Sequence, residues 1–515
     1  MGRAMRMTVD AAGLARRLAP RDDVLVLEAM VGDDPGERRY SADEGPFRSY
    51  ERVVRYRETA HGTFELDQRV RFRTAIPVFS VLFHPLIARA LRKAPGPGYK
   101  PVWLLPDRLG ARASSIVAAM CLFHVVGGVL YALLTNLLTF ASHDLGDGSA
   151  GEQSVVFAVA RIGALLTIVV MAFADRVGRR RVAIWAAGVS VLLTIASAAA
   201  PSLVTLAFLQ TFSRNLAIAA MLASDTLSVE EIPPGSRASA QGLAALSYGL
   251  GTGAVVILLP LADLGDGAWR LVFLVALLCA PVIAIASRHL PESRRFTHRE
   301  RFVPEARRVR PARFVYLAVL LVLVNLFVSP ASQLQNDYLR TDRGFSGSRI
   351  TLFLVVTSVL GTFGVLWGSR LADRRSRRMA LVPGLLAAGV LGAVFFMVSG
   401  APMWITSTIA TGVGALSIPA LGVLAPEMFP TARRGTARGA LSAIATGGSA
   451  LGLLVAGVLV DRLDYGAAFG WLMIAPLLAT VMAVWAPESS GVELEELNEN
   501  VVEREGADDP TRASP

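Results

Sequence analysis

Cysteine is nearly absent from this sequence of 515 residues, and its two copies, Cys121 and Cys279, both lie in apolar runs. Such thiols exclude a disulfide framework, and no group of cysteines and histidines has the spacing of a metal site. The sequence also lacks a nucleophile–base pair and a glycine-rich phosphate loop. We therefore expect no enzyme activity, no catalytic residue, no metal and no cofactor.

Lysine is also scarce: Lys93 and Lys100 are the only two, so arginine supplies nearly all of the positive charge. Hydrophobic residues make up 53% of the chain and charged residues 18%, with a net charge of +10. A soluble globular protein is seldom this apolar, so the composition indicates a membrane protein. The arginines lie in gaps between apolar runs, which argues against nucleic-acid binding.

Apolar segments long enough to cross a bilayer, at about 20 residues each, recur along the chain. The twelve candidates are 115–140, 153–174, 182–200, 202–225, 238–261, 268–288, 314–338, 350–371, 380–399, 402–425, 436–460 and 467–486. We therefore predict an all-α integral membrane protein with twelve transmembrane helices.

Alternate loops between these segments differ sharply in charge. The loops on one predicted side carry twenty-two arginines, nine of them between Arg288 and Arg313, whereas the loops on the other side carry five. Because basic loops resist translocation, we expect the arginine-rich side and both termini in the cytoplasm, with the chain in the cytoplasmic membrane. The sequence opens on no signal-peptide pattern, which agrees with that expectation.

Three motifs occur twice, in the same order and at nearly the same spacing. The first copies are "FADRVGRRRV" (Phe173–Val182), "EEIPPGSRA" (Glu230–Ala238) and "PESRRF" (from Pro291); the second copies are "LADRRSRRMA" (Leu371–Ala380), "EMFPTARRG" (Glu427–Gly435) and "PESSGV" (from Pro487). The repetition predicts two pseudo-symmetric halves of six helices each, with a substrate site between them at mid-membrane.

The expected division of the chain follows from these features. It comprises an N-terminal cytoplasmic extension (1–113), a first six-helix half (114–288), a central loop (289–313), a second half (314–486) and an acidic tail (487–515). In the extension, Tyr50–Arg73 alternates as two strands around His61-Gly62, and Ile76–Lys93 resembles an amphipathic helix on the membrane surface. We expect a small α/β module there.

The repeated loops resemble those of the major facilitator superfamily. "ADRVGRRR" is similar to the family motif between helices 2 and 3, and "ADRRSRRM" to its repeat between helices 8 and 9. The glutamate–arginine motifs and the closing "PESSGVELEEL" resemble the sugar-porter and metabolite-symporter branches. The family usually has a glycine where this chain carries Met171 and Ser369. The resemblance implies a secondary transporter that works by alternating access.

The candidate gating residues lie in these motifs. Gly178 permits a tight turn, and Asp175, near the start of the third helix, suits a positive helix end or a bond from Arg179 or a neighbouring helix. The resemblance adds Glu230 to this charge network. The full set is Asp175, Arg176, Gly178, Arg179, Glu230, Arg237, Asp373, Arg377, Glu427 and Arg434. The alternative is a solvated loop that only sets topology.

Candidate substrate-binding residues lie inside the spans, where charge is costly and usually functional. His124, Arg161 and Arg214 fall at similar central depths, and we expect no acid at their level. Such a set favours an anion in a water-filled cavity; bonds to helix carbonyls are the alternative. Neutral polar groups complete the set, which is Arg161, Arg214, His124, Asn215, Asn325, Gln333 and Trp404.

The predicted function is secondary active transport of a small organic solute, anionic or sugar-like, with proton coupling left open. The alternatives are a drug exporter and a membrane receptor without transport. "YGLGTGAVV" (Tyr248–Val256) lacks the proline typical of drug–proton antiporters, which disfavours the exporter. We expect the substrate, membrane lipid and, if transport is coupled, protons as partners of a monomer.

Overall fold

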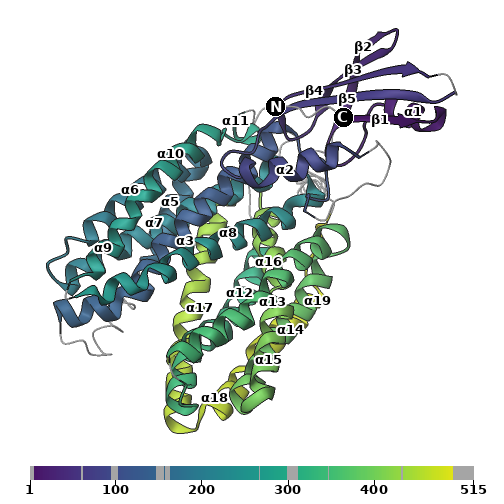
Figure 1. The fold of residues 1–515 in the computed structure, drawn as a ribbon. Coiled ribbons are helices and arrows are strands. Elements are labelled where there is room, and N and C mark those ends of the chain that lie inside the picture. The colour runs from purple at the N-terminus through teal and green to yellow at the C-terminus, as the bar shows by residue number, and fades with distance from the viewer. Residues whose placement is uncertain are drawn as a thin grey trace, which may run out of the picture.

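The computed structural model describes residues 5–59, 62–93, 103–146, 156, 163–265, 267–297, 311–345, 347–430 and 433–490. A small β-sheet stands at one end of a long helical bundle (Figure 1). We call that end of the bundle the sheet end and the opposite end the far end.

The sheet has five antiparallel strands in the order β1-β5-β4-β3-β2. The strands are β1 (Met5–Val9), β2 (Leu27–Asp34), β3 (Glu37–Glu44), β4 (Phe47–Glu58) and β5 (Phe64–Thr74), and helix α1 (Ala11–Leu18) follows β1. The two strands predicted within Tyr50–Arg73 are confirmed as β4 and β5. The other three strands were not predicted, because β2 and β3 carry too many charges to alternate clearly.

A buried ion pair organises one face of this sheet. Arg52 lies on β4 and donates to Glu28 on β2 over 2.9 Å from Nε and 2.5 Å from Nη2. Glu28 also accepts from the Tyr50 hydroxyl at 2.5 Å and from the Arg21 amide at 2.8 Å. Burial, and then the Glu28 charge, raise the pKa of Tyr50 well above its usual value. The face therefore carries a buried charge pair between two apolar clusters, one that includes Tyr50 and one that includes Val54.

Helix α2 (Ser80–Leu91) confirms the helix predicted within Ile76–Lys93. Its inner face, with Ile87 and Leu91, packs on the sheet. On its other face Val81 is 80% exposed and Leu82 66% exposed. An apolar face left uncovered on a short helix is typical of a helix lying on a membrane.

Two helix groups follow. The first helix group is α3 (Ala111–Leu145), α5 (Ala164–Val177), α6 (Arg179–Ser197), α7 (Leu203–Glu231), α8 (Arg237–Leu258), α9 (Trp269–Leu274) and α10 (Cys279–His289). The second helix group is α12 (Pro311–Asp337), α13 (Gly347–Arg374), α14 (Arg377–Met397), α15 (Gly400–Gly414), α16 (Ser417–Met428), α17 (Arg434–Arg462), α18 (Tyr465–Leu472) and α19 (Ile474–Val484). A short helix, α11 (Arg294–Thr297), lies between the groups.

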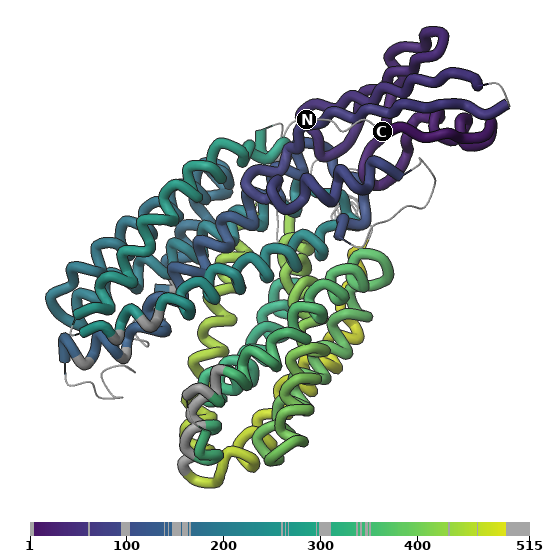
Figure 2. Tube along the Cα trace, in the orientation of Figure 1, coloured from purple at the N-terminus to yellow at the C-terminus, as the bar shows by residue number. Residues whose placement is uncertain are grey.

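Eleven helical stretches among the described residues are long and apolar enough to cross a membrane. The predicted span 153–174 is represented only by α5, since most residues before Gly163 lie outside the described part. The chain is thus a multi-pass helical protein, and the count of twelve stays a prediction. Figure 2 shows the two groups approaching each other at the sheet end and diverging toward the far end.

The sheet face yields a test of the module. We expect Glu28→Gln to leave the buried Arg52 guanidinium without its charge partner. This should lower the free energy of unfolding of the N-terminal module by about 3 kcal/mol. Hydrogen exchange of the full-length protein should accelerate in β2, β4 and β5 while the helix groups stay protected. Glu37→Gln is the matched control, because Glu37 pairs with Arg39 and Arg55 on the exposed edge. Equal effects of both substitutions would contradict the account.

Candidate functional site

Asp175, near the end of α5, binds the first turn of α17 in the other helix group. Its Oδ1 accepts from the Gly435 amide at 3.0 Å, and its Oδ2 accepts from the Thr436 amide at 2.7 Å and from the Thr436 hydroxyl at 2.8 Å. The first amides of a helix have no partner within the helix and carry partial positive charge. A carboxylate from one group therefore caps a helix of the other.

Asp373, near the end of α13, makes the reciprocal contact. Its two carboxylate oxygens accept from the Ala238 amide at 2.8 Å and from the Ser239 amide at 2.6 Å, in the first turn of α8. The second group thus caps a helix of the first. The two aspartates of the repeated loops have the same role in opposite directions.

Each aspartate belongs to a chain of charges. In the first chain, Arg179 Nη2 lies 3.2 Å from Asp175 Oδ1 and 3.4 Å from Glu230 Oε1. Arg434, from the second group, lies 2.8 Å from the same Glu230 oxygen. The chain therefore crosses between the groups twice, once at the helix cap and once at this ion pair.

The second chain repeats the first. Arg377 lies 2.7 Å from Asp373 Oδ1 and 2.9 Å from Glu427 Oε1. Arg237, from the first group, lies 3.5 Å from the same Glu427 oxygen. We call these eight residues the sheet-end network; they are Asp175, Arg179, Glu230, Arg237, Asp373, Arg377, Glu427 and Arg434.

The sheet-end network is buried, since none of its eight residues is more than 6% exposed. Each chain holds two acids and two arginines, so its formal charge is zero. Burying charge is costly unless every ion is paired. The network is therefore stable only while both groups are in contact, because each group supplies an arginine that the glutamate of the other needs.

Glycines on α17 allow the close approach of the two groups. A Cβ at Gly435 would lie 2.7 Å from Asp175 Oδ1, and one at Gly439 would lie 2.9 Å from Met171 Cβ. In the second copy, a Cβ at Gly242 would lie 3.0 Å from Ser369 Cβ. Where the family usually has glycine, this chain carries Met171 and Ser369, and glycines on the facing helices provide the space instead.

Gly178 and Glu292 fix the turn that follows Asp175. Gly178 has φ +114°, and a Cβ there would lie 2.3 Å from Glu292 Oε2. Glu292 accepts from the amides of Arg179 at 3.1 Å and Arg180 at 3.2 Å, so it caps α6. The first Pro-Glu-Ser motif, which in the sequence only marked the repeat, therefore supplies a helix cap.

Glu488 of the second Pro-Glu-Ser motif has the same position at α14. It accepts from the Ser376 hydroxyl and from the Arg377 amide at 3.0 Å. Burial alone would raise the pKa of Glu488, but these bonds and the Ser490 amide together lower it. The next residue, Ser489, donates to Glu427 Oε2 at 2.6 Å and so joins this turn to the sheet-end network.

The segment before α3 connects the sheet to the same region. Arg108 binds Asp22 and donates to the Asp23 carbonyl at 2.7 Å. The Asp107 amide donates to Ser236 Oγ at 2.9 Å, immediately before Arg237 of the sheet-end network. These contacts connect the N-terminal module to the start of α8, next to the sheet-end network.

The predicted gating set is largely brought together. Eight of its ten residues form the sheet-end network and Gly178 forms the adjoining turn. Arg176 is exposed and stands apart from the described contacts. Asp175 lies in the last turn of α5, four residues before α6 begins, but the helix whose first amides it binds is α17. The bond from Arg179 and the contact with a neighbouring helix are both present.

The predicted substrate residues of the first group separate into two levels. Arg214 lies over the Tyr131 ring, 3.8 Å from its centroid, with Nη2 3.4 Å from Thr135 Oγ1. His124 instead lies 3.3 Å from Asp225 Oδ1. Arg214 and Asp225 are eleven residues apart on α7, about 16 Å along the helix axis. The expectation of similar depths is therefore wrong for His124 and Arg214, and the expectation that no acid lies at their level is wrong for His124.

The remaining predicted substrate residues are scattered. The side-chain amides of Asn215 and Asn325 donate within their own helices, to the carbonyls of Thr211 at 2.7 Å and Leu321 at 2.9 Å. Trp404 packs edge-on against Phe353 with 4.7 Å between ring centroids. Gln333 is exposed near the end of α12. Arg161 lies outside the described residues, so its role stays a prediction.

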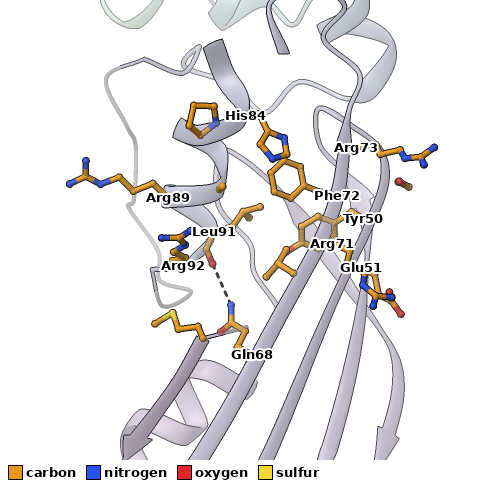
Figure 3. A pocket seen from close by; sticks show the side chains of 15 residues that line it. Tyr50, Glu51, Gln68, Arg71, Phe72, Arg73, His84, Arg89, Leu91 and Arg92 are labelled. Atoms are coloured by element: carbon orange, nitrogen blue, oxygen red, sulfur yellow. Dashed lines mark hydrogen bonds between the residues drawn. The ribbon is translucent and has the colours of Figure 1, made fainter. Parts of the chain in front are cut away.

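A cavity of about 990 Å³ lies away from this region, in the N-terminal module. In it His84 stacks on Phe72 with 4.7 Å between centroids. Arg89 on α2 and Arg73 on β5 extend in different directions (Figure 3), so the arginines do not converge on a common point. Among the described residues, no group of three or more His, Cys, Asp or Glu could hold a metal ion.

Comparisons with known proteins agree with this geometry. The sequence model of the Major Facilitator Superfamily matches residues 116–401 and 315–506. Among solved structures, the proton:xylose symporter XylE, bound to 6-bromo-6-deoxy-D-glucose, has a TM-score of 0.63 at 18% identity and covers 76% of this chain and 99% of its own.

Two further structures have the same fold. The human organic anion transporter MFSD10 has a TM-score of 0.59 at 15% identity over 72% of this chain and 99% of its own. A bacterial homologue of the iron transporter ferroportin, in an outward-facing state, has a TM-score of 0.56 at 17% identity over 73% of this chain and 98% of its own.

The glycine contacts yield a test of the closed sheet end. Gly439→Val should push α17 away from α5 and destabilise the closed contact by about 1–3 kcal/mol. A thiol introduced by Ser239→Cys, with Cys121 and Cys279 replaced by alanine, should then react faster with a water-soluble maleimide. Gly447→Val is the control, because a Cβ at Gly447 of the same helix meets nothing within 4 Å. Unchanged labelling of the Gly439 variant would contradict the account.

Proposed function

The chain belongs to the major facilitator superfamily, and from this membership we propose that it is a secondary active transporter that works by alternating access between its two helix groups. The observation that carries the proposal is the reciprocal capping at the sheet end. Asp175 and Asp373 each bind helix amides of the opposite group. Such a contact holds one end of the transporter closed, and its release would open that end.

The sheet-end network has two stable arrangements, closed and open, because its charges are satisfied in both. When the groups are in contact, each charge is paired and buried. When they separate, water reaches the same charges and replaces the lost bonds, so the open arrangement is also accessible. Intermediate separations leave charges desolvated and unpaired, which is costly. Alternation between closed and open is favoured over gradual widening.

We assign the sheet end to the cytoplasm. The arginine-rich loops, including Arg176 and Arg375, lie at this end, and basic loops favour the cytoplasmic side. The apolar face of α2 would then rest on the inner membrane surface. With the sheet end closed, the structure corresponds to an outward-facing conformation of a protein in the cytoplasmic membrane, active as a monomer with both termini inside.

The substrate proposal rests on Arg214. It is 7% exposed, and among the described residues no carboxylate pairs with it. A buried guanidinium held over an aromatic ring can bind a carboxylate or phosphate with two parallel hydrogen bonds. Tyr131, and Tyr248 with its ring centroid 6.3 Å away, add surfaces on which a sugar ring or planar acid could stack. We therefore propose a small organic anion or a sugar-like solute, with Arg161 as a second contact.

The similar structures support both substrate classes without deciding between them. XylE is a proton:xylose symporter and MFSD10 an organic anion transporter. A receptor without transport would not need a contact that both groups must break together, which favours transport. The pairing of His124 with Asp225, at 3.3 Å, favours coupling to protons.

Solute flux into proteoliposomes tests the proposal. A panel of organic acids, sugars and cationic drugs should give uptake of an acid or a sugar. We expect Arg214→Gln to reduce anion uptake at least about 100-fold. Arg214→Lys should recover only part of the uptake, because an ammonium group keeps the positive charge but cannot form the two parallel hydrogen bonds of a planar guanidinium. Arg161→Gln should act in the same direction.

Arg349→Gln is the matched control for these variants. Arg349 also lies over an aromatic ring, 4.1 Å from the Phe345 centroid, but it is exposed. Its loss should leave flux within about two-fold, as for surface substitutions generally. Normal uptake by both Arg214→Gln and Arg161→Gln would contradict the anion proposal, and uptake of cationic drugs alone would favour export.

A further inference from the structure

His124, Asp225 and Arg438 form a buried cluster next to the sheet-end network. They lie on α3, α7 and α17, so the cluster joins the two helix groups. His124 and Arg438 are each 8% exposed and Asp225 is 4% exposed. Arg438 follows Arg434 by one helical turn, and Asp225 precedes Glu230 by five residues on α7. The cluster is therefore the next layer inward from the sheet end.

The hydrogen bonds of this cluster leave a position for one proton. His124 Nδ1 lies 3.0 Å from the Met120 carbonyl oxygen. Since a carbonyl only accepts, Nδ1 carries the hydrogen, and Nε2 of a neutral ring presents a lone pair. That nitrogen lies 3.3 Å from Asp225 Oδ1, which has no hydrogen-bond donor in the described part of the chain. Two acceptors thus face each other in a buried site.

Arg438 holds the other oxygen of the same carboxylate. Its Nη2 lies 2.6 Å from Asp225 Oδ2, while its Nη1 has no acceptor in the described residues. The bond between Arg438 and Asp225 is a further crossing between the groups, in addition to the two helix caps and the Glu230–Arg434 and Glu427–Arg237 pairs. With neutral His124 the cluster holds one negative and one positive charge.

We propose that His124 and Asp225 together bind a proton whose presence weakens the bond of Arg438 to the first helix group. The proton enters from solution onto His124 Nε2, which then donates to Asp225 Oδ1. Two cations now share one carboxylate, and the buried cluster gains a net positive charge. The arrangement in which Arg438 withdraws with the second group and becomes hydrated is therefore favoured. When the proton leaves, the pair of Arg438 and Asp225 is restored.

The groups surrounding His124 support this assignment. Within the described part of the chain, Asp225 on α7 and Arg438 on α17 are the charged groups at its level. On α8, the neutral Gln241 donates to Ser228 Oγ at 3.4 Å, and Cys121 lies one turn earlier on α3. α10 meets α3 near Ser115, which donates to the His289 carbonyl at 2.9 Å, nine residues before His124. No second base among these groups competes for the proton.

This inference rests on the proposed function, because it supplies the coupling step of that transporter. Protonation from the outside would favour opening at the cytoplasmic end, and release of the proton inside would favour closure. The bound ion would thereby drive uptake of the solute.

Thiol labelling as a function of pH tests the proton site without a substrate. The full-length protein carries Ser239→Cys at the sheet end, with both native cysteines replaced by alanine. Labelling, normalised to the rate of a free thiol at each pH, should rise at least about five-fold between pH 8 and pH 5.5, at the lower limit of typical coupling. His124→Gln should remove the rise and stay slow, whereas Asp225→Asn should label fast at every pH.

His289→Gln is the matched control. His289 Nδ1 binds the Ile285 carbonyl at 2.8 Å, as His124 binds that of Met120, but no carboxylate is paired with it in the described residues. The control should retain the pH-dependent rise. Monodisperse elution verifies folding of each variant, and His124→Asn provides a second, smaller replacement. A rise that persists in folded His124→Gln or His124→Asn would overturn the proposal.

The proposal and the proposed function fail in different experiments. If proteoliposomes show pH-dependent labelling at the sheet end but no flux of any solute, the transport proposal is contradicted and the proton-site proposal is not. If a solute is transported but labelling of the protein that retains His124 is independent of pH, the proton-site proposal is contradicted and the transport proposal is not.

Discussion

Each helix group depends on the other for the anion that caps one of its helices. α17 begins with amides that Asp175 accepts from across the interface, and α8 begins with amides that Asp373 accepts. Among the described residues, the amides of Gly435 and Thr436 in α17 and of Ala238 and Ser239 in α8 have their acceptors in the opposite group. The glutamate–arginine chains, the glycines that let α17 approach α5, and the turns held by Glu292 and Glu488 all position these two carboxylates.

Because the contacts are reciprocal, the proposed mechanism requires the sheet end to open as a unit. Loss of one cap exposes a helix start in one group and leaves an acid unpaired in the other, so the remaining crossings are weakened. Buried ion pairs contribute little net stability against hydrated ones, which suits a contact that must form and break in every cycle. The bond between Asp107 and Ser236 connects the segment that follows the N-terminal module to the start of α8.

The sequence predicted the members of the network better than their partners. Asp175, Gly178 and Arg179 were recognisable because an acid and a turn glycine interrupt an arginine run between apolar segments. The helix that Asp175 caps could not be predicted, since Thr436 lies 261 residues further along the chain.

The position of Asp225 within its helix was also predicted wrongly. The hydropathy pattern ended the fourth span at Asp225, whereas α7 continues to Glu231. The pair of Asp225 and Arg438 was therefore missed. Two of the five strands of the sheet were predicted, because β4 and β5 alternate while β2 and β3 are dominated by charge.

Spin-label distances test the reciprocal contact most directly. Labels at Arg176 and Arg433, both exposed on opposite sides of the contact, report the sheet end, and labels at Leu264 and Ala401 report the far end. The account predicts one short sheet-end distance in the otherwise unchanged protein. In the double variant Asp175→Asn and Asp373→Asn, a longer sheet-end population should appear together with a shorter far-end population. Identical distance distributions in both proteins would contradict the claim that these carboxylates hold the two groups together.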